Sequence, residues 1–218
     1  MKMTRIVVVA IALAACAFAQ DSRKLPLQYN VKGNLLTPAA GSGFSIEIAE
    51  GFRYVGGQRF VLKQVADAEQ HVFVEAGADG RVQRMVWVQF ESFLPSNTHR
   101  YNYKLPDQVR LGDIDFISDA MVFRLYESDD PESDHSAMTR LLEARKLKLA
   151  GPTARRRMFR LSQPDRRREL MIIYAEAVKL EPAEIHDEGA PDERWPEIAR
   201  SLREGAQRSI AVRDNAGR

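Results

Sequence analysis

The sequence has a single cysteine, Cys16, so one chain cannot be held together by disulfides. Its four histidines form none of the HxxxH, HExxH or HxH spacings that are typical of zinc sites. The GxSxG serine motif and the GxxxxGK[ST] and GxGxxG phosphate-binding loops are also missing. The sequence therefore predicts no catalytic residues, no metal site and no cofactor.

An excess of charge of one sign is absent as well. The 218 residues include 32 Lys and Arg against 30 Asp and Glu. If residues 1–19 are removed as a leader, Lys2 and Arg5 are lost, and the mature chain carries 30 charges of each sign. Because nucleic-acid binding usually needs a basic excess, we expect no nucleic-acid partner.

Residues 1–19 have the pattern of a secretory signal peptide. Lys2 and Arg5 precede an apolar run, and Ala17-Phe18-Ala19 stands before Gln20 as a small-residue cleavage site. The apolar stretch to Ala19 covers 14 residues, whereas a helix that crosses a bilayer needs roughly 20. We therefore expect cleavage after Ala19 and a periplasmic or secreted protein.

A second reading of the leader centres on Cys16. Leu13-Ala14-Ala15-Cys16 resembles a bacterial lipobox, in which the cysteine is lipidated and becomes the new N-terminus. This alternative predicts lipidation at Cys16 and a membrane-tethered lipoprotein instead of a free one. The sequence leaves the two outcomes open.

The mature chain is expected to divide into three parts. Residues 20–43 form an N-terminal segment with a candidate strand, 44–213 form a single α+β domain, and 214–218 form a tail. In the first half of the domain, apolar and polar residues alternate as they do in strands. Gly56-Gly57 and Asp79-Gly80 are typical of hairpin turns. The expected strands of this antiparallel meander are 44–48, 58–63, 71–75 and 82–90.

Residues 113–126 permit two readings. Ile114, Ile117, Met121 and Leu125 have helical spacing behind a capping Asp113, which predicts a helix. The neighbouring apolar residues also permit a strand, and this alternative stays open.

Two further helices are predicted. Ser133 is suited to cap a helix over 134–146 whose inner stripe would be Ala137, Leu141 and Ala144. Apolar spacing from Trp195 to Ile210 predicts a C-terminal amphipathic helix. The expected fold class is therefore α+β: an antiparallel sheet, built from the meander and a later hairpin, packed with two or three helices.

The later hairpin should pair 154–162 with 168–178, with Phe159 opposite Leu170 and Phe159, Leu161, Leu170, Ile172 and Tyr174 on one apolar face. This hairpin holds the sharpest cluster of charge in the chain. Because arginine binds phosphates and carboxylates through two parallel hydrogen bonds, the cluster predicts an anionic partner, including a membrane surface. The candidate binding residues are Arg155, Arg156, Arg157, Arg160, Arg166, Arg167 and Arg168.

Taken together, the patterns favour an exported bacterial envelope protein that binds a small ligand or another envelope protein without catalysis. Contact with a membrane is expected only through lipidated Cys16 or the arginine hairpin. The alternative function is a periplasmic hydrolase whose carboxylates and histidines converge only on folding, with His71 and either Glu69 or Glu75 as candidates.

Overall fold

β-Structure dominates the fold. The computed structural model describes residues 25–123, 130–179 and 193–215, so the leader, including Cys16, lies outside the described residues. Strands make up 51% of the structure, and the described residues contain two helices. The α+β prediction is confirmed in outline, with far more sheet than helix.

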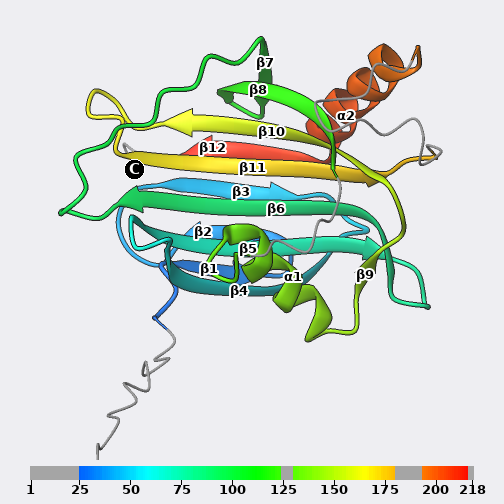
Figure 1. The fold of residues 1–218 in the computed structure, drawn as a ribbon, viewed down its shortest axis with the longest axis horizontal. Coiled ribbons are helices and arrows are strands. Elements are labelled where there is room, and N and C mark those ends of the chain that lie inside the picture. Colours follow the sequence, from blue (N-terminus) through cyan, green and yellow to red (C-terminus); the bar gives the residue numbers. More distant parts are fainter. Residues whose placement is uncertain (1–24, 124–129, 180–192, 216–218) are drawn as a thin grey trace, which may run out of the picture.

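Two antiparallel sheets form the body (Figure 1). The smaller sheet has the order β1-β2-β3-β12, and its strands are β1 (Tyr29–Lys32), β2 (Leu35–Pro38), β3 (Phe44–Ile48) and β12 (Ile210–Asp214). The larger sheet has the order β4-β5-β6-β11-β10-β8-β7, and β9 adds a short parallel pair with β6. Its strands are β4 (Arg53–Leu62), β5 (Ala66–Ala76), β6 (Arg81–Phe93), β7 (Asp107–Leu111), β8 (Ile114–Phe123), β9 (Lys148–Leu149), β10 (Thr153–Leu161) and β11 (Arg168–Ala177).

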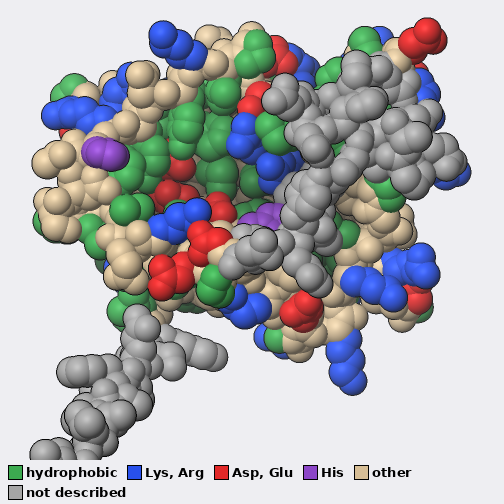
Figure 2. All heavy atoms as spheres, viewed as in Figure 1, with side chains coloured by type: hydrophobic (Ala, Val, Ile, Leu, Met, Phe, Trp, Pro, Cys, Tyr) green, Lys and Arg blue, Asp and Glu red, His purple; other side chains and the backbone are tan. Residues whose placement is uncertain are grey.

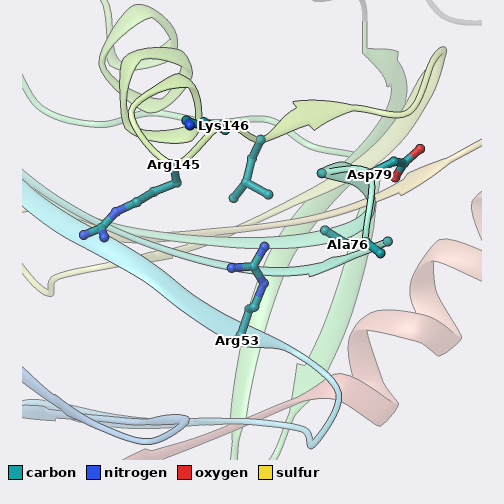
Figure 3. A pocket seen from close by; sticks show the side chains of 9 residues that line it. Arg53, Ala76, Asp79, Arg145 and Lys146 are labelled. Atoms are coloured by element: carbon teal, nitrogen blue, oxygen red, sulfur yellow. The ribbon is translucent and has the colours of Figure 1, made fainter.

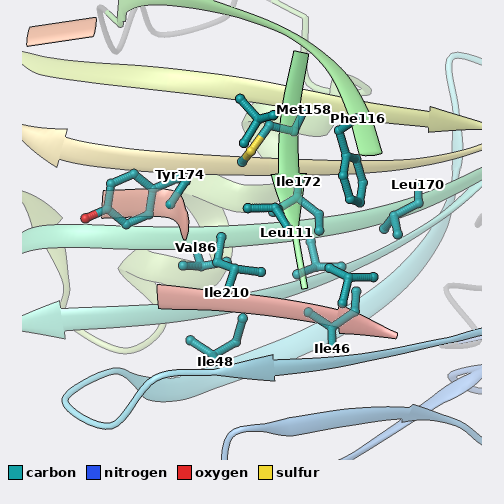
Figure 4. Packing of buried hydrophobic residues seen from close by; sticks show 14 of the residues in the cluster. Ile46, Ile48, Val86, Leu111, Phe116, Met158, Leu170, Ile172, Tyr174 and Ile210 are labelled. Atoms are coloured by element: carbon teal, nitrogen blue, oxygen red, sulfur yellow. The ribbon is translucent and has the colours of Figure 1, made fainter. Parts of the chain in front are cut away.

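The main core lies between the two sheets (Figure 4). Ile46 and Ile210 from the small sheet meet Ile172 and Tyr174 from the large one. Helix α2 (Trp195–Ser209) closes this core, and its Gly205 lies against the Tyr174 ring so closely that a Cβ would lie 2.6 Å from the tyrosine oxygen. The predicted C-terminal amphipathic helix is confirmed. Among the described residues, neither helix is long and apolar enough to cross a bilayer.

A second apolar cluster covers the opposite face of the large sheet. Helix α1 (Asp134–Glu143) packs Met138 and Leu142 on this face against Val72, Trp87 and their neighbours. The Ser133 side chain accepts a hydrogen bond from the Ser136 amide, so the predicted N-cap is confirmed.

The inner stripe predicted for this helix is partly wrong. Ala137 is buried as predicted, but the other two buried residues are Met138 and Leu142. Ala144, at the C-cap, is exposed. The helix ends at Glu143, so the last turn that would have buried Ala144 does not form.

The prediction of a hairpin turn at Gly56-Gly57 is wrong. Both glycines lie inside β4, where the register with β5 shifts after Tyr54. A Cβ on Gly57 would lie 2.7 Å from both His71 Nδ1 and the Tyr54 hydroxyl oxygen. The glycine is therefore needed for close approach of side chains, and not for a turn.

The helical reading of residues 113–126 is also wrong where the chain is described, and residues 124–126 lie outside the described residues. Residues 114–123 form strand β8, paired with β7 and β10, and Asp113 lies in the turn before it. Phe116 packs in the main core, whereas Ile117 packs against the second cluster. Because both faces of the strand meet apolar neighbours, its sequence lacks the simple alternation of a half-exposed strand.

The second hairpin exists, but its predicted register is wrong by one residue. Phe159 pairs with Met171, and Arg160 pairs with Leu170. Leu170 therefore points into the main core, while Phe159 lies on the α1 face. Apolar residues on both faces of these strands made the two registers look alike in sequence.

Candidate functional site

Two glutamates lie side by side on the face that carries α1. Glu91 on β6 is directly opposite Glu169 on β11, and both strands present these residues on the same face as Trp87 and Met171. Side chains opposite one another in an antiparallel pair have Cβ atoms about 4.5–5.5 Å apart. Tyr101 and Tyr103, from the segment between β6 and β7, contact these acids. We call these four residues the carboxyl–tyrosine cluster: Glu91, Glu169, Tyr101 and Tyr103.

The two carboxyls differ in their hydrogen bonds. Tyr101 donates from its hydroxyl to Glu91 Oε2 at 3.0 Å, and the Gln89 amide donates to Glu91 Oε1. Glu169, which is 6% exposed, interacts electrostatically with the nearby Tyr103 hydroxyl. Its Oε2 atom is buried and has no hydrogen-bond partner among the described residues. Because an unmatched buried polar atom is costly, this oxygen marks a place where a ligand group would be favoured.

Burial changes the protonation of this cluster. Desolvation raises the pKa of Glu169 to about 8, and the nearby Glu91 charge acts in the same direction, while the Tyr103 hydroxyl opposes it. Desolvation also raises the pKa of Glu91, while Gln89 and Tyr101 oppose it. The Glu169 carboxyl is therefore mostly protonated and uncharged at pH 7.

The two tyrosines remain hydroxyl donors over the same range. Burial and the neighbouring glutamates raise the pKa values of both Tyr101 and Tyr103. The cluster thus combines hydroxyl donors with the mostly protonated Glu169 carboxyl at neutral pH.

Aromatic rings flank the acids on this face. Phe93 stacks on Tyr101 with ring centroids 4.3 Å apart, and Tyr103 lies 4.5 Å from Phe159. Figure 2 shows a recessed apolar strip on this face, with acidic and basic side chains beside it. Polar groups next to aromatic faces suit a ligand that has both hydroxyl groups and apolar edges.

A ladder of glutamines fixes α1 beside this cluster. Gln70 Nε2 donates to Gln89 Oε1 at 2.6 Å and to the Asp134 carbonyl at 2.9 Å, where α1 begins. The Trp87 indole also donates to Gln89 Oε1, at 3.0 Å. Trp87 is therefore connected through Gln89 to Glu91 and can report on events there.

The seven arginines of the hairpin do not gather on one surface. Arg156 points to the α2 side, where it is buried and bonds Ser118 and Asp107, while Arg157 points to the α1 side and pairs with Asp119. Arg155 shares that side, where burial lowers its pKa to about 10. At the turn, Arg167 donates to the Leu94 carbonyl at 2.9 Å. The remaining members are the half-buried Arg166 and the exposed Arg160 and Arg168.

The predicted anionic partner of these arginines stays a prediction. Strand alternation sends Arg156 and Arg157 to opposite faces of the sheet. On its own face, each arginine pairs with a carboxylate of the same chain.

His71 has a structural place in the fold. It is fully buried, its Nε2 lies 2.8 Å from Glu69 Oε1, and its Nδ1 lies 3.0 Å from the Tyr54 hydroxyl. Glu69 in turn accepts hydrogen bonds from the backbone amides of Gln28, at 2.6 Å, and Tyr29, at 2.9 Å. Glu69 and His71 thus tie the chain entering β1 to β5.

The other candidate partner of this histidine, Glu75, pairs with Arg84. Within the described ranges, no group of three or more His, Cys, Asp or Glu side chains is placed to hold a metal ion. His186 lies outside the described residues.

Sequence reasoning missed the carboxyl–tyrosine cluster. The pairing of Glu91 with Glu169 depends on a β6–β11 contact between strands that are distant in sequence. The one local signal was the Tyr101-Asn102-Tyr103 pattern, which places two aromatic residues on the same side of an extended segment.

Comparisons with known proteins leave the function to be argued from this geometry: no protein-family model, no curated protein and no solved structure matches the chain.

Proposed function

We propose that this chain is an exported bacterial envelope protein that binds a small, uncharged, hydroxyl-bearing ligand at the carboxyl–tyrosine cluster without altering it. The observation that carries the proposal is the buried Glu169 Oε2 atom without a hydrogen-bond partner among the described residues, beside the rings of Tyr103 and Phe159. A ligand hydroxyl would satisfy this oxygen, while the rings would cover the apolar edges of the ligand.

Charge also favours an uncharged ligand. With the Glu169 carboxyl mostly protonated at pH 7, this carboxyl offers hydrogen bonds without a charge of its own. A cationic ligand would have to displace the proton from this carboxyl. An anionic ligand would meet Glu91 and Asp134, which contact the same Gln89 amide.

One observation favours a second function, a hydrolase. Two opposed carboxyl groups, one of which holds its proton at neutral pH, are the arrangement needed for a general acid and its partner carboxylate. In this function Glu169 would donate the proton, and His71 would take no part because it is buried between the sheets.

Saccharide binding tests the two functions against each other. The probes are maltose, cellobiose and diacetylchitobiose, followed by Trp87 fluorescence in a W195F background. For a binding protein, we expect saturable binding without turnover, little change in E169Q, and a loss of about tenfold or more in E169L, because leucine cannot make the hydrogen bond. The control E50Q alters an exposed glutamate and should leave affinity unchanged.

The outcomes separate cleanly. A hydrolase would release monosaccharide, and E169Q would slow this by roughly 10²–10⁴-fold while keeping affinity. If none of the three sugars binds, or if E169L binds as well as the unaltered chain, the proposed site is wrong.

Export has its own test at the N-terminus. Mass spectrometry of the protein from bacterial cells should find Gln20 as the first residue, because Ala17-Phe18-Ala19 forms the cleavage site. Leucine at positions 17 and 19 should block this cleavage. A lipid-modified Cys16 would instead show the tethered form, and a chain that still begins at Met1 would contradict export.

A further inference from the structure

A shallow pocket of about 500 Å³ lies at the other end of α1 (Figure 3). Its walls are the start of β4, the turn after β5 and the residues that follow α1. The carboxyl–tyrosine cluster lies near Asp134, where α1 begins, so the two places are separated by the length of the helix. The lining residues are Arg53, Ala76, Gly77, Ala78, Asp79, Gly80, Arg145, Lys146 and Leu147.

The pocket carries an uncompensated positive charge. Arg53, Arg145 and Lys146 all line it, and none of them makes an ion pair with a described residue. The single lining carboxylate, Asp79, is already paired with Arg81 at 3.2 Å, and Figure 3 shows it pointing away from Arg53. Three cations and one already paired carboxylate thus line the pocket, and the Arg145 guanidinium lies over Gly56 on β4, away from Arg53, so it would have to turn inward to meet a ligand.

Helix electrostatics explains only part of this arrangement. Basic residues after a helix often complement the negative C-terminal end of its dipole, which accounts for Arg145 and Lys146. Arg53 comes from a different element, the first residue of β4, and the dipole gives no reason for its place in the same pocket.

The walls of the pocket are held at a fixed separation. Gly80 has a φ of +78°, and a Cβ there would lie 2.6 Å from the Lys146 carbonyl oxygen. The Lys148 amide donates to the Gly80 carbonyl at 3.1 Å, and β9 then continues in parallel with β6. The backbone walls of the pocket are therefore pre-organised, whereas the Arg53, Arg145 and Lys146 side chains are exposed and would be ordered by the ligand.

We propose that this pocket binds the phosphoryl group of a small phosphorylated molecule or a lipid headgroup. Arginine forks bind phosphoryl oxygens through paired hydrogen bonds, and lysine adds a compact charge. A phosphoryl dianion neutralises three cations better than a carboxylate does. The volume exceeds that of a phosphate alone and falls in the range of small-molecule sites.

Calorimetry with two phosphoryl carriers tests the site. The soluble probe is glucose 6-phosphate, and the membrane probe is vesicles of phosphatidylglycerol compared with phosphatidylcholine. The double variant R53Q/K146Q should lose at least tenfold in affinity, because it removes two of the three cations, and binding to the unaltered chain should weaken with added salt. The matched control K32Q/R200Q removes one lysine and one arginine from exposed positions elsewhere and should bind within about twofold of the unaltered chain.

The two probes distinguish a soluble phosphoester from a lipid headgroup as the ligand of the pocket. Binding of glucose 6-phosphate alone assigns the site to soluble phosphoesters, and binding of the anionic vesicles alone assigns it to lipid headgroups. The proposal is overturned if neither carrier binds, or if the control loses as much affinity as R53Q/K146Q, since only overall charge would then matter.

Discussion

Replacing Glu69 by alanine is expected to lower the free energy of unfolding by about 3–5 kcal/mol, since one partner of a buried polar pair is removed. The carboxyl is 2% exposed and accepts hydrogen bonds from His71 and from the Gln28 and Tyr29 amides. Alanine would leave the Nε2 atom of the fully buried His71 ring without its partner. The amide of Tyr29 would lose its acceptor at the same time.

Urea unfolding followed by circular dichroism measures this loss, and a chain of this size should also melt roughly 6–20 °C lower. The control E50A removes an exposed carboxylate and should change stability by no more than about 0.5 kcal/mol. Hydrogen exchange at the Tyr29 amide should accelerate in E69A, because the start of β1 is no longer tied to β5. An E69A protein as stable as E50A would show that the Glu69–His71 contact does not hold the sheets.

Replacing Glu169 by glutamine is expected to stabilise the protein at high pH. The folded carboxyl has its pKa raised from 4.5 to about 8, mainly by burial. The folded state therefore keeps a proton that the unfolded state has released, and stability falls as pH rises from about 4.5 to about 8. Glutamine does not titrate, so E169Q escapes this loss. Relative to the unaltered chain, E169Q should gain about 3–5 kcal/mol between pH 4.5 and pH 9.

Urea unfolding of both proteins at several pH values between 4 and 9 checks this prediction. The difference between them isolates Glu169 from the other titrating groups, although Glu91 acts in the same direction. E50Q, changed at an exposed position, should track the unaltered chain at every pH. A difference between E169Q and the unaltered chain that stays constant with pH would show that Glu169 is ionised in the fold.

Much of the fold could be predicted where a residue pattern is compatible with only one kind of secondary structure. The expected strand 82–90 has Val86, Val88 and Phe90 on one side and Met85 and Trp87 on the other, a pattern typical of a central strand, and both faces of β6 are covered. The N-cap Ser133 and the C-terminal helix were also predicted. These features depend on neighbours within a few residues, which a single sequence displays.

The errors share a physical cause. Strands β8, β10 and β11 have apolar contacts on both faces, so neither period nor register could be derived from their alternation. Gly57 was read as a turn because its role, making room for His71 and Tyr54, exists only in three dimensions. The pairing of Glu91 with Glu169 has the same origin, since strand order decides it and sequence spacing does not.

The smaller sheet has a consequence for when the protein can fold. Its fourth strand, β12, pairs with β3 along residues 210–214, and Ile210 and Val212 fill the main core. A chain whose residues 210–214 are not yet available therefore cannot complete the sandwich, and its apolar interior stays open. Under the proposed export, this delay would keep the polypeptide unfolded during transport, as a narrow secretion channel requires.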